Sequence, residues 1–441
     1  MLRYIIKRLL LFIPTLILVS CLTFFLGKQV PADQVAMLLN IQGIDDSNDL
    51  WISEYDKIYK KMNLHLPEFY FSVRPNYLIN TVNRNFEIYE RKFVSKISSQ
   101  KYSKEYVYQL QGLINQTPEV PRKKLFNSVG FSHLSAKLFA MGNELPESLK
   151  KSIIELIDKS ENHKVKWHYP IISYNGFQNQ YHKWIQNIFK GDLGISLLDT
   201  RPVTDKLWEA LRWSLVLVTL NLVFALMLAF PIGVYNGMRP NSLFDNISNS
   251  TLFAFFAIPK FWLATLFLIF FTTEEYGTWT NIFPSVGIWY SQGAQSFTSM
   301  LASSWHKLIL PILMLVIPDA AYIARLIRAS VKEESNKEYI KTALSKGMSV
   351  KNITIKHILP NSLIPTISLL VSTLPGALAS ALIIEVIFNI PGIGRLMFIS
   401  INSADWAMVY PIVLIISVVT VIIFLLGDIL IAYLNPKIKF K

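Results

Sequence analysis

Cysteine is almost absent from this chain, because Cys21 is the only one among its 441 residues. A single cysteine forms no internal disulfide and no cysteine-based metal cluster, so neither is expected. Charged residues are also scarce, at 17% against 52% hydrophobic residues, and the mean hydropathy is +0.35. This balance exceeds what water-soluble domains usually show, and it predicts a membrane protein.

Signatures of catalysis are missing as well. The sequence has no His-Glu-x-x-His, no Gly-x-Ser-x-Gly and no paired-cysteine motif, which disfavours a membrane enzyme. His163 and His168 lie five residues apart in a polar segment, where surface histidines are commoner than metal ligands. No Gly-x-x-x-x-Gly-Lys-Ser/Thr loop is present to bind phosphates, so any ATP hydrolysis must occur on another polypeptide. The formal charge of +13 comes without a nucleic-acid motif, and no nucleic-acid partner is expected.

Six apolar blocks have the length of a bilayer-spanning helix, which needs about 20 residues for a hydrocarbon core of about 30 Å. Only two of the blocks contain charge: the third contains Lys260, and the fourth contains Asp319 and Arg325. The predicted fold class is therefore an all-α polytopic membrane protein with six transmembrane helices. The blocks are residues 9–27, 213–238, 251–273, 308–327, 361–384 and 407–427.

The first block also imitates a lipoprotein signal peptide, because a basic start and an apolar stretch lead to Leu18-Val19-Ser20-Cys21. The apolar run continues through Phe25, however, and cleavage at Cys21 would leave an odd number of spans. An uncleaved first helix is the better interpretation.

Basic residues indicate the side on which each loop lies, since Lys and Arg near helix ends are retained in the cytoplasm. Segment 325–360 carries eight cations against three anions, and further basic residues precede the first block and follow the last. We therefore expect this segment and both termini to be cytoplasmic. The predicted location is the bacterial cytoplasmic (inner) membrane, with lipid around a multi-pass chain.

A long polar stretch, 28–206, separates the first block from the second and is expected outside the cytoplasm, where it is large enough to form a domain. Apolar residues at helical spacing predict helices over 50–62, 145–157 and 181–189. The expected organisation is a first span within 1–27, the extracytoplasmic region, and a core of five spans over 207–441. A basic and aromatic surface for an acidic partner is expected from Arg91, Lys92, Lys96, Lys101, Lys104, Tyr89, Tyr102 and Tyr106.

Two short helices are predicted in the cytoplasmic loop 329–360. Gly347 closes the first, because glycine adopts the left-handed conformation of a helix end at low cost. Ser349 caps the second, which is expected to end at Pro360. Ala343 leaves a shallow place on the first helix where a partner's backbone can approach. Such a compact hairpin can transmit force as a rigid knob.

This hairpin resembles the loop called EAA in permeases of binding-protein-dependent ABC importers, where a coupling helix inserts into a groove of the ATPase subunit. The Glu, Ala and Gly of that loop fall on Glu338 or Tyr339, Ala343 and Gly347, the first being matched loosely. Other elements match the peptide and nickel permeases in order along the chain. These are 1–15, Gly191-Asp-Leu-Gly194 with Arg201-Pro-Val203, 258–262, 324–330, 385–395 with Pro391-Gly-Ile-Gly394, and 428–437.

The resemblance implies the type I fold of ABC importer permeases and a non-catalytic subunit that forms the pathway for peptides or a similar small solute. The implied partners are a second, identical or related permease, two cytoplasmic ATPase subunits that bind ATP-Mg, and an extracytoplasmic solute-binding protein. No catalytic, cofactor or metal site is implied in this chain itself. Relatives have a shorter external stretch, so about 74–176 is an insert. The residues implied in ATPase coupling are Glu338, Tyr339, Ala343, Gly347 and Ser349.

Lys260 and Asp319 are charged where the family suggests small, polar or aromatic residues. Charges within spans are functional by default, although they can also form one static ion pair. The sequence leaves both roles open, a static pair and the lining of the pathway. The two residues also support an alternative function, an ion-coupled secondary transporter or channel, but such a protein has no use for an ATPase-docking hairpin.

Overall fold

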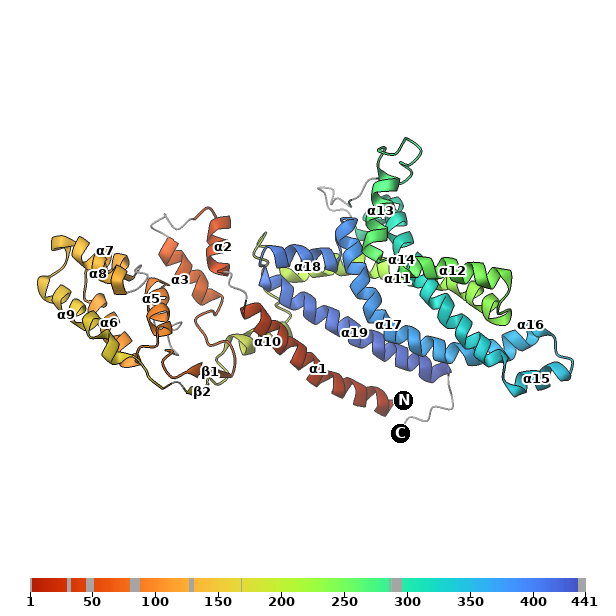
Figure 1. Cartoon of the computed structure of the whole chain (residues 1–441), viewed down its shortest axis with the longest axis horizontal. Helices are drawn as coiled ribbons and strands as arrows, with labels where there is room; N and C mark the ends of the chain where they lie inside the picture. The colour runs from red at the N-terminus through yellow and green to blue at the C-terminus, as the bar shows by residue number, and fades with distance from the viewer. Residues whose placement is uncertain are drawn as a thin grey trace. The chain divides into compact units, whose positions relative to one another are not determined.

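The structure, a computed structural model, describes residues 2–29, 33–44, 51–79, 88–126, 131–167, 169–284, 287 and 296–434. His168 and the basic C-terminal residues fall outside these ranges. The chain forms two compact units, one comprising Met1–Val30 with Leu193–Lys441 and the other Pro31–Asp192. Helices dominate both units, as the sequence predicts (Figure 1).

Long apolar helices make up most of the first unit. Within the described residues, four single helices are long and apolar enough to cross a membrane, and a bent pair brings the number to five. The fifth predicted block falls on a further helix of 29 residues, α17 (Leu359–Ile387). The four single helices are α1 (Leu2–Lys28), α11 (Val203–Met238), α14 (Phe297–Ser335) and α19 (Trp406–Leu434).

The third predicted span is wrong as a single continuous helix. Its residues divide between α12 (Leu243–Ala257) and α13 (Lys260–Thr272), which are bent by 94°. Ile258, at the break, is extended with φ −79° and ψ 128°, because the ring of Pro259 disfavours helical geometry in the residue before it. Lys260 is therefore the first residue of a short helix and does not lie midway along a continuous span.

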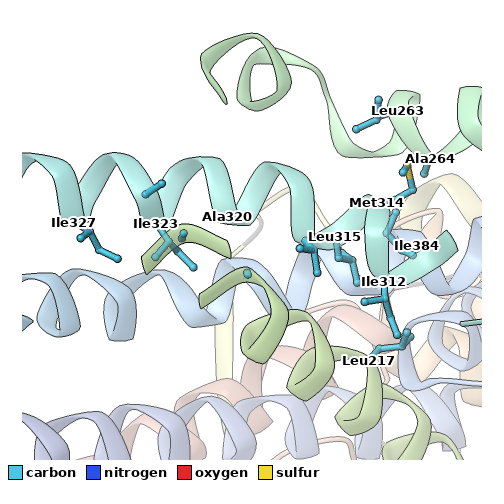
Figure 2. Packing of buried hydrophobic residues seen from close by; sticks show 14 of the residues in the cluster. Leu217, Leu263, Ala264, Ile312, Met314, Leu315, Ala320, Ile323, Ile327 and Ile384 are labelled. Atoms are coloured by element: carbon cyan, nitrogen blue, oxygen red, sulfur yellow. The ribbon is translucent and has the colours of Figure 1, made fainter. Parts of the chain in front are cut away.

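The apolar core of the first unit follows α14. Figure 2 shows side chains along this helix, among them Leu315 and Ile323, together with Leu217 of α11, Leu263 of α13 and Ile384 of α17. The backbones of α11 and α14 approach closely where α11 carries glycine. A Cβ atom built at Gly233 or Gly237 would lie 2.7 Å from the side chain of the α14 residue opposite. Small residues at such contacts are typical of helix packing in membranes.

The predicted hairpin is present, but its second helix does not end at Pro360. Following α15 (Glu338–Ser345), α16 (Val350–Ile353) continues through a π-helical turn, Thr354–Ile358, directly into α17. Pro360 lies in the first turn of α17. A proline has no backbone N–H to donate, and the wider turn before it accommodates the ring without ending the helix. The hairpin is thus continuous with a membrane-spanning helix.

The second unit is a set of short helices with one two-stranded sheet. Three of the helices confirm the predicted ones: α3 (Trp51–Lys61), α9 (Glu147–Asp158) and α10 (Gln180–Phe189). The strands β1 (Phe71–Pro75) and β2 (Pro170–Tyr174), which the sequence did not suggest, pair antiparallel with Phe71 opposite Tyr174. The chain between them leaves and returns through this ribbon, close to the predicted bounds of the insert. The other helices are α2 (Gln34–Ile41), α5 (Ile88–Ser99), α6 (Lys104–Asn115), α7 (Glu119–Phe126) and α8 (Phe131–Ala140).

Candidate functional site

The predicted coupling hairpin has the local geometry that its sequence predicts. Gly347 has φ +78°, the left-handed conformation that glycine adopts at little cost. Ser349 caps α16, its Oγ accepting a hydrogen bond from the backbone N–H of Asn352 at 3.4 Å. Ala343 is half-buried against the core of the first unit, so the open face of α15 lies elsewhere. Figure 1 shows α15 and α16 together at one end of the long helices.

A buried carboxylate anchors this hairpin to two membrane helices. Glu334, near the end of α14, is 6% exposed and lies 2.5 Å from the ammonium of Lys337. It also accepts a hydrogen bond from the Tyr339 hydroxyl, and Asn361 of α17 donates to that hydroxyl at 3.2 Å. The hydrogen bond that Lys337 donates to Glu334 raises the pKa of Lys337, and burial together with the hydrogen bond to Glu334 raises the pKa of Tyr339. Sequence reasoning missed Glu334 and Asn361, which no motif marks.

Three aliphatic side chains of the hairpin and the turn that follows it are exposed. Leu344 is 47% exposed, Val350 59% and Ile355 53%. Tyr339 is half-exposed, and the exposed carboxylate of Glu338 lies 2.9 Å from the ammonium of Lys341. Exposed apolar residues that lie together are typical of an interaction site, so these side chains are candidates for one.

Lys260 and Asp319 meet inside the first unit. The Lys260 ammonium lies 2.6 Å from Oδ1 of Asp319, and Nδ2 of Asn221 donates to the other carboxylate oxygen at 2.8 Å. Lys260 belongs to α13, Asp319 to α14 and Asn221 to α11. They line a cavity of about 340 Å³ whose other walls are mainly apolar, with Phe256 and Tyr322 stacked at 5.8 Å. The sequence marked both charges, but Asn221 gave no signal.

A second ion pair, missed from the sequence, fixes the N-terminal end of α12. Asp245 is fully buried and accepts hydrogen bonds from Nε and Nη2 of Arg328 at 2.6 and 2.7 Å. The backbone N–H of Asn241 donates to the same carboxylate at 2.8 Å. A bidentate arginine–carboxylate pair is among the strongest and most directional polar contacts. It holds α12 against α14 although the partners are 83 positions apart in the sequence.

The glycine-rich segment 391–394 wraps around another buried carboxylate. Glu385 accepts hydrogen bonds from Ser214 Oγ and from the backbone N–H of Gly394, both at 2.6 Å. A Cβ atom at Gly392 would lie 2.3 Å from the carboxyl carbon of Glu385, so only glycine fits there. The short helix α18 (Ile393–Asn402), which the sequence did not suggest, begins at this point.

Several residues expected on the surface of the second unit are buried. Arg91 is 9% exposed, lies 2.5 Å from Asp56 and stacks on Tyr59 at 3.8 Å. Tyr102 and Tyr106 are also in the core, and His163 stacks on Tyr106 at 4.8 Å. Arg91 and Tyr106 lie on the buried faces of α5 and α6, so they do not form the expected surface. In the described parts of the chain, no group of three His, Cys, Asp or Glu side chains could hold a metal ion.

Comparisons with known proteins identify the family. Residues 229–440 match the family described as binding-protein-dependent transport system inner membrane component. The oligopeptide transport system permease protein AppB of Bacillus subtilis is 32% identical over 262 residues, which cover 59% of this chain and 80% of that protein. This chain belongs to the binding-protein-dependent transport system inner membrane components. The family match includes the hairpin and the segment around Glu385.

Two other relatives of this inner membrane component match it with similar identity and coverage. The dipeptide transport system permease protein DppB of Alkalihalophilus pseudofirmus is 30% identical over 272 residues, 59% of this chain and 81% of that protein. The glutathione transport system permease protein GsiC of Escherichia coli is 30% identical over 263 residues, 60% of this chain and 80% of that protein.

The family membership confirms the predicted class of protein. The chain is a non-catalytic permease subunit of an ABC importer, with its ATPase on partner subunits, and it is a multi-pass protein of the inner membrane. None of these comparisons supports the ion-coupled carrier or channel. They do not test individual residues, so the coupling roles of the hairpin and the role of Lys260 and Asp319 stay predictions.

Proposed function

We propose that this permease forms the membrane pathway of an importer for peptides or a similar small solute. The names of the three relatives support a peptide-type solute, since they refer to dipeptides, oligopeptides and glutathione. A second permease, identical or related, would complete the pathway, with two cytoplasmic ATPase subunits and a solute-binding protein outside. ATP-Mg would bind only to the ATPase subunits, and this chain would hold no cofactor.

The observation that carries the proposal is the attachment of the hairpin. It runs without interruption into α17 and is hydrogen-bonded through Tyr339 to Glu334 of α14. Any displacement of the hairpin therefore moves two membrane helices at once. Because α14 also carries Asp319 in the cavity wall, ATPase closure on ATP would be transmitted to the pathway and turn the cavity outward.

The docking surface in this proposal is the exposed apolar face of the hairpin, with Leu344 and Val350 at its centre. Gly347 and Ser349 shape the turn between the two helices, and Glu338 lies at the exposed start of α15. Tyr339 links the docking surface to the membrane helices. Ala343 contributes to the packing of α15 as well as to any contact with the ATPase.

Val350→Asp tests this docking surface with little risk to the fold. Val350 is the first residue of α16, where a negative charge favours the helix, yet a carboxylate on an apolar docking surface opposes binding. We expect the variant to stay in the membrane and to lose the co-purifying ATPase. Val120→Asp is the matched control, because Val120 is similarly exposed, at 64%, but lies in the second unit. Normal substrate-stimulated ATP hydrolysis by the Val350→Asp complex would contradict the proposal.

The proposed topology has both termini and the hairpin in the cytoplasm, and Pro31–Asp192 outside. We propose that the insert within this unit, about 74–176, contacts the solute-binding protein or covers the external mouth of the pathway; a helical decoration without a partner is the alternative. In a Cys21→Ser background, Ser99→Cys should react with a membrane-impermeant maleimide added to cells whose outer membrane is permeabilised and whose inner membrane is intact. Ser345→Cys, which is also exposed but lies on the hairpin, should not react. The reverse pattern would overturn the topology.

A further inference from the structure

The cavity beside α14 combines apolar walls with three polar groups of complementary chemistry. Lys260 offers an ammonium donor, Asp319 a carboxylate and Asn221 an amide, each from a different helix. Phe256 and Leu222 belong to the apolar walls. Small-molecule sites typically consist of an apolar cavity with a few placed polar groups, in volumes of about 300–1,000 Å³. This cavity lies at the lower end of that range, which favours a short ligand.

One of these polar groups has an unused acceptor. Asn221 is 5% exposed, and its Nδ2 donates to Asp319. Its Oδ1 is buried and, among the residues that the structure describes, has no hydrogen-bond partner. A buried acceptor without a donor is costly and uncommon in folded proteins. An N–H group of a ligand in the cavity would satisfy it.

The ion pair next to Asn221 is not sealed in the protein. The side chains of Lys260 and Asp319 remain 25% and 20% exposed, so both charges reach the cavity. The break at Pro259 places Lys260 at the start of α13, from where its long side chain can move away from Asp319. Charges within a membrane protein are expensive and are mostly kept where they serve binding or transport.

We infer that this cavity binds a zwitterionic peptide by both of its termini. Asp319 and Oδ1 of Asn221 accept hydrogen bonds from the amino-terminal ammonium, while Lys260 turns to the carboxylate. The empty site pairs Lys260 with Asp319, and the peptide exchanges this internal pair for two external ones. The apolar walls accommodate side chains without selecting their sequence. The inference rests on the proposed peptide pathway and assigns its recognition residues.

Protection of a thiol in the cavity tests the inference on the assembled permease and ATPase complex without the solute-binding protein. Val218→Cys, in a Cys21→Ser background, places the thiol on the cavity wall. The probes are trialanine, N-acetyl-trialanine and trialanine amide. Trialanine should slow the labelling of this thiol. Each blocked peptide should need a concentration at least about tenfold higher to give the same protection, because it loses a hydrogen bond to a charged group.

Variants assign each terminus to its residue. Asn221→Ala should reduce the preference for a free amino terminus, and Lys260→Met should remove the preference for a free carboxylate while the other preference remains. Lys307→Met is the matched control, because Lys307 lies on α14 outside this cavity and should keep both preferences. If Lys260→Met does not assemble, Lys260→Met with Asp319→Leu removes both charges, and the three peptides should then protect equally.

Equal protection by the three peptides in the complex with Lys260 and Asp319 intact would overturn the inference, as would no protection by trialanine at millimolar concentration. Peptide uptake by the complete importer is measured separately. Uptake with equal protection would leave the proposed function standing and remove only this site. Absence of peptide uptake would instead defeat the proposed function.

Discussion

Buried carboxylates distinguish the two units of this permease. Among the described residues, the buried carboxylates all belong to the first unit, and each accepts hydrogen bonds from another helix or from a turn; they are Asp245, Glu334, Glu385 and Asp405. The largest core of the second unit is apolar, although this unit also buries Arg91. Its fully buried side chains include Val107, Leu110, Leu134, Leu138 and Ile153.

The two units also differ in the solvent that surrounds them. Outside the membrane, burying apolar surface removes it from water and stabilises the fold by about 25 cal/mol per Å². Lipid tails are as apolar as leucine, so helices in a bilayer are held by close packing and by polar contacts instead. In the first unit, Gly233 and Gly237 allow such close packing of α11 against α14, and the bidentate pair of Asp245 with Arg328 joins α12 to α14 next to the predicted spans. Truncating a buried apolar residue should therefore destabilise the second unit most, and truncating a buried carboxylate should destabilise the first.

Leu110→Ala should give the largest effect and should be confined to the second unit. Leu110 is fully buried in α6, and removing its side chain leaves a cavity that costs about 2–5 kcal/mol. Hydrogen exchange should accelerate through α5, α6 and α9, while the ATPase still co-purifies. Val120→Ala, at an exposed site, should leave exchange unchanged. Loss of ATPase binding in Leu110→Ala would mean that the units are not separable.

Asp245→Ala should have the next largest effect, in the first unit. It leaves the Arg328 guanidinium without its carboxylate, at a cost of about 3 kcal/mol when a buried pair is broken. The free energy of unfolding in detergent micelles should fall accordingly. Glu155→Ala breaks the exposed pair of Glu155 with Lys159 in the second unit and should change little. Equal losses for these two variants would contradict the comparison.

Asp319→Ala should be more damaging than Lys260→Met combined with Asp319→Leu. The single change leaves a lone ammonium in a membrane cavity, whereas the double change leaves none, and a lone buried charge costs more than its absence. The amount of assembled importer complex in the membrane measures the difference. Equal and additive losses would show that the two residues act separately.

The smallest effect concerns pH and the anchor of the hairpin. The hydrogen bond to Glu334 raises the pKa of Lys337, so the stabilisation by this pair is complete below the ordinary lysine pKa of about 10.4 and is lost as pH rises through the folded value. The ratio of transport to ATP hydrolysis should therefore not change between pH 6 and 8 through this pair. Lys337→Met should lower the ratio equally at both pH values. If Lys337→Met lowered the ratio of transport to ATP hydrolysis at only one of the two pH values, the assignment would be contradicted.

Much of this architecture could be predicted from local sequence. Hydropathy located the apolar spans, and Gly347 and Ser349 marked the turn of the hairpin, because helix ends and caps depend on neighbouring residues. The bend at Pro259 also had a local signal, the restricted residue before a proline, which the long apolar run concealed. The continuity of α16 with α17 had no local signal. A proline usually ends a helix, and the π-helical turn is an exception.

The tertiary part of the site could not be predicted. Asn221 approaches Asp319 across 98 residues, and Asp245 approaches Arg328 across 83. Such pairings depend on how the helices pack, which no local pattern encodes. The paired strands β1 and β2 are short and flanked by prolines at Pro75 and Pro170, and their register is likewise set by the fold around them.

Photo-cross-linking from the hairpin tests the central claim most directly. A photoreactive phenylalanine analogue at Leu344, on the exposed face of α15, is activated in native membranes, and the cross-linked proteins are identified by mass spectrometry. The same analogue at Val120 is the control. The account predicts that Leu344 cross-links to an ABC ATPase in an ATP-dependent manner and that Val120 does not. A Leu344 derivative that cross-links to no ATPase, in a membrane where the importer is active, would contradict it.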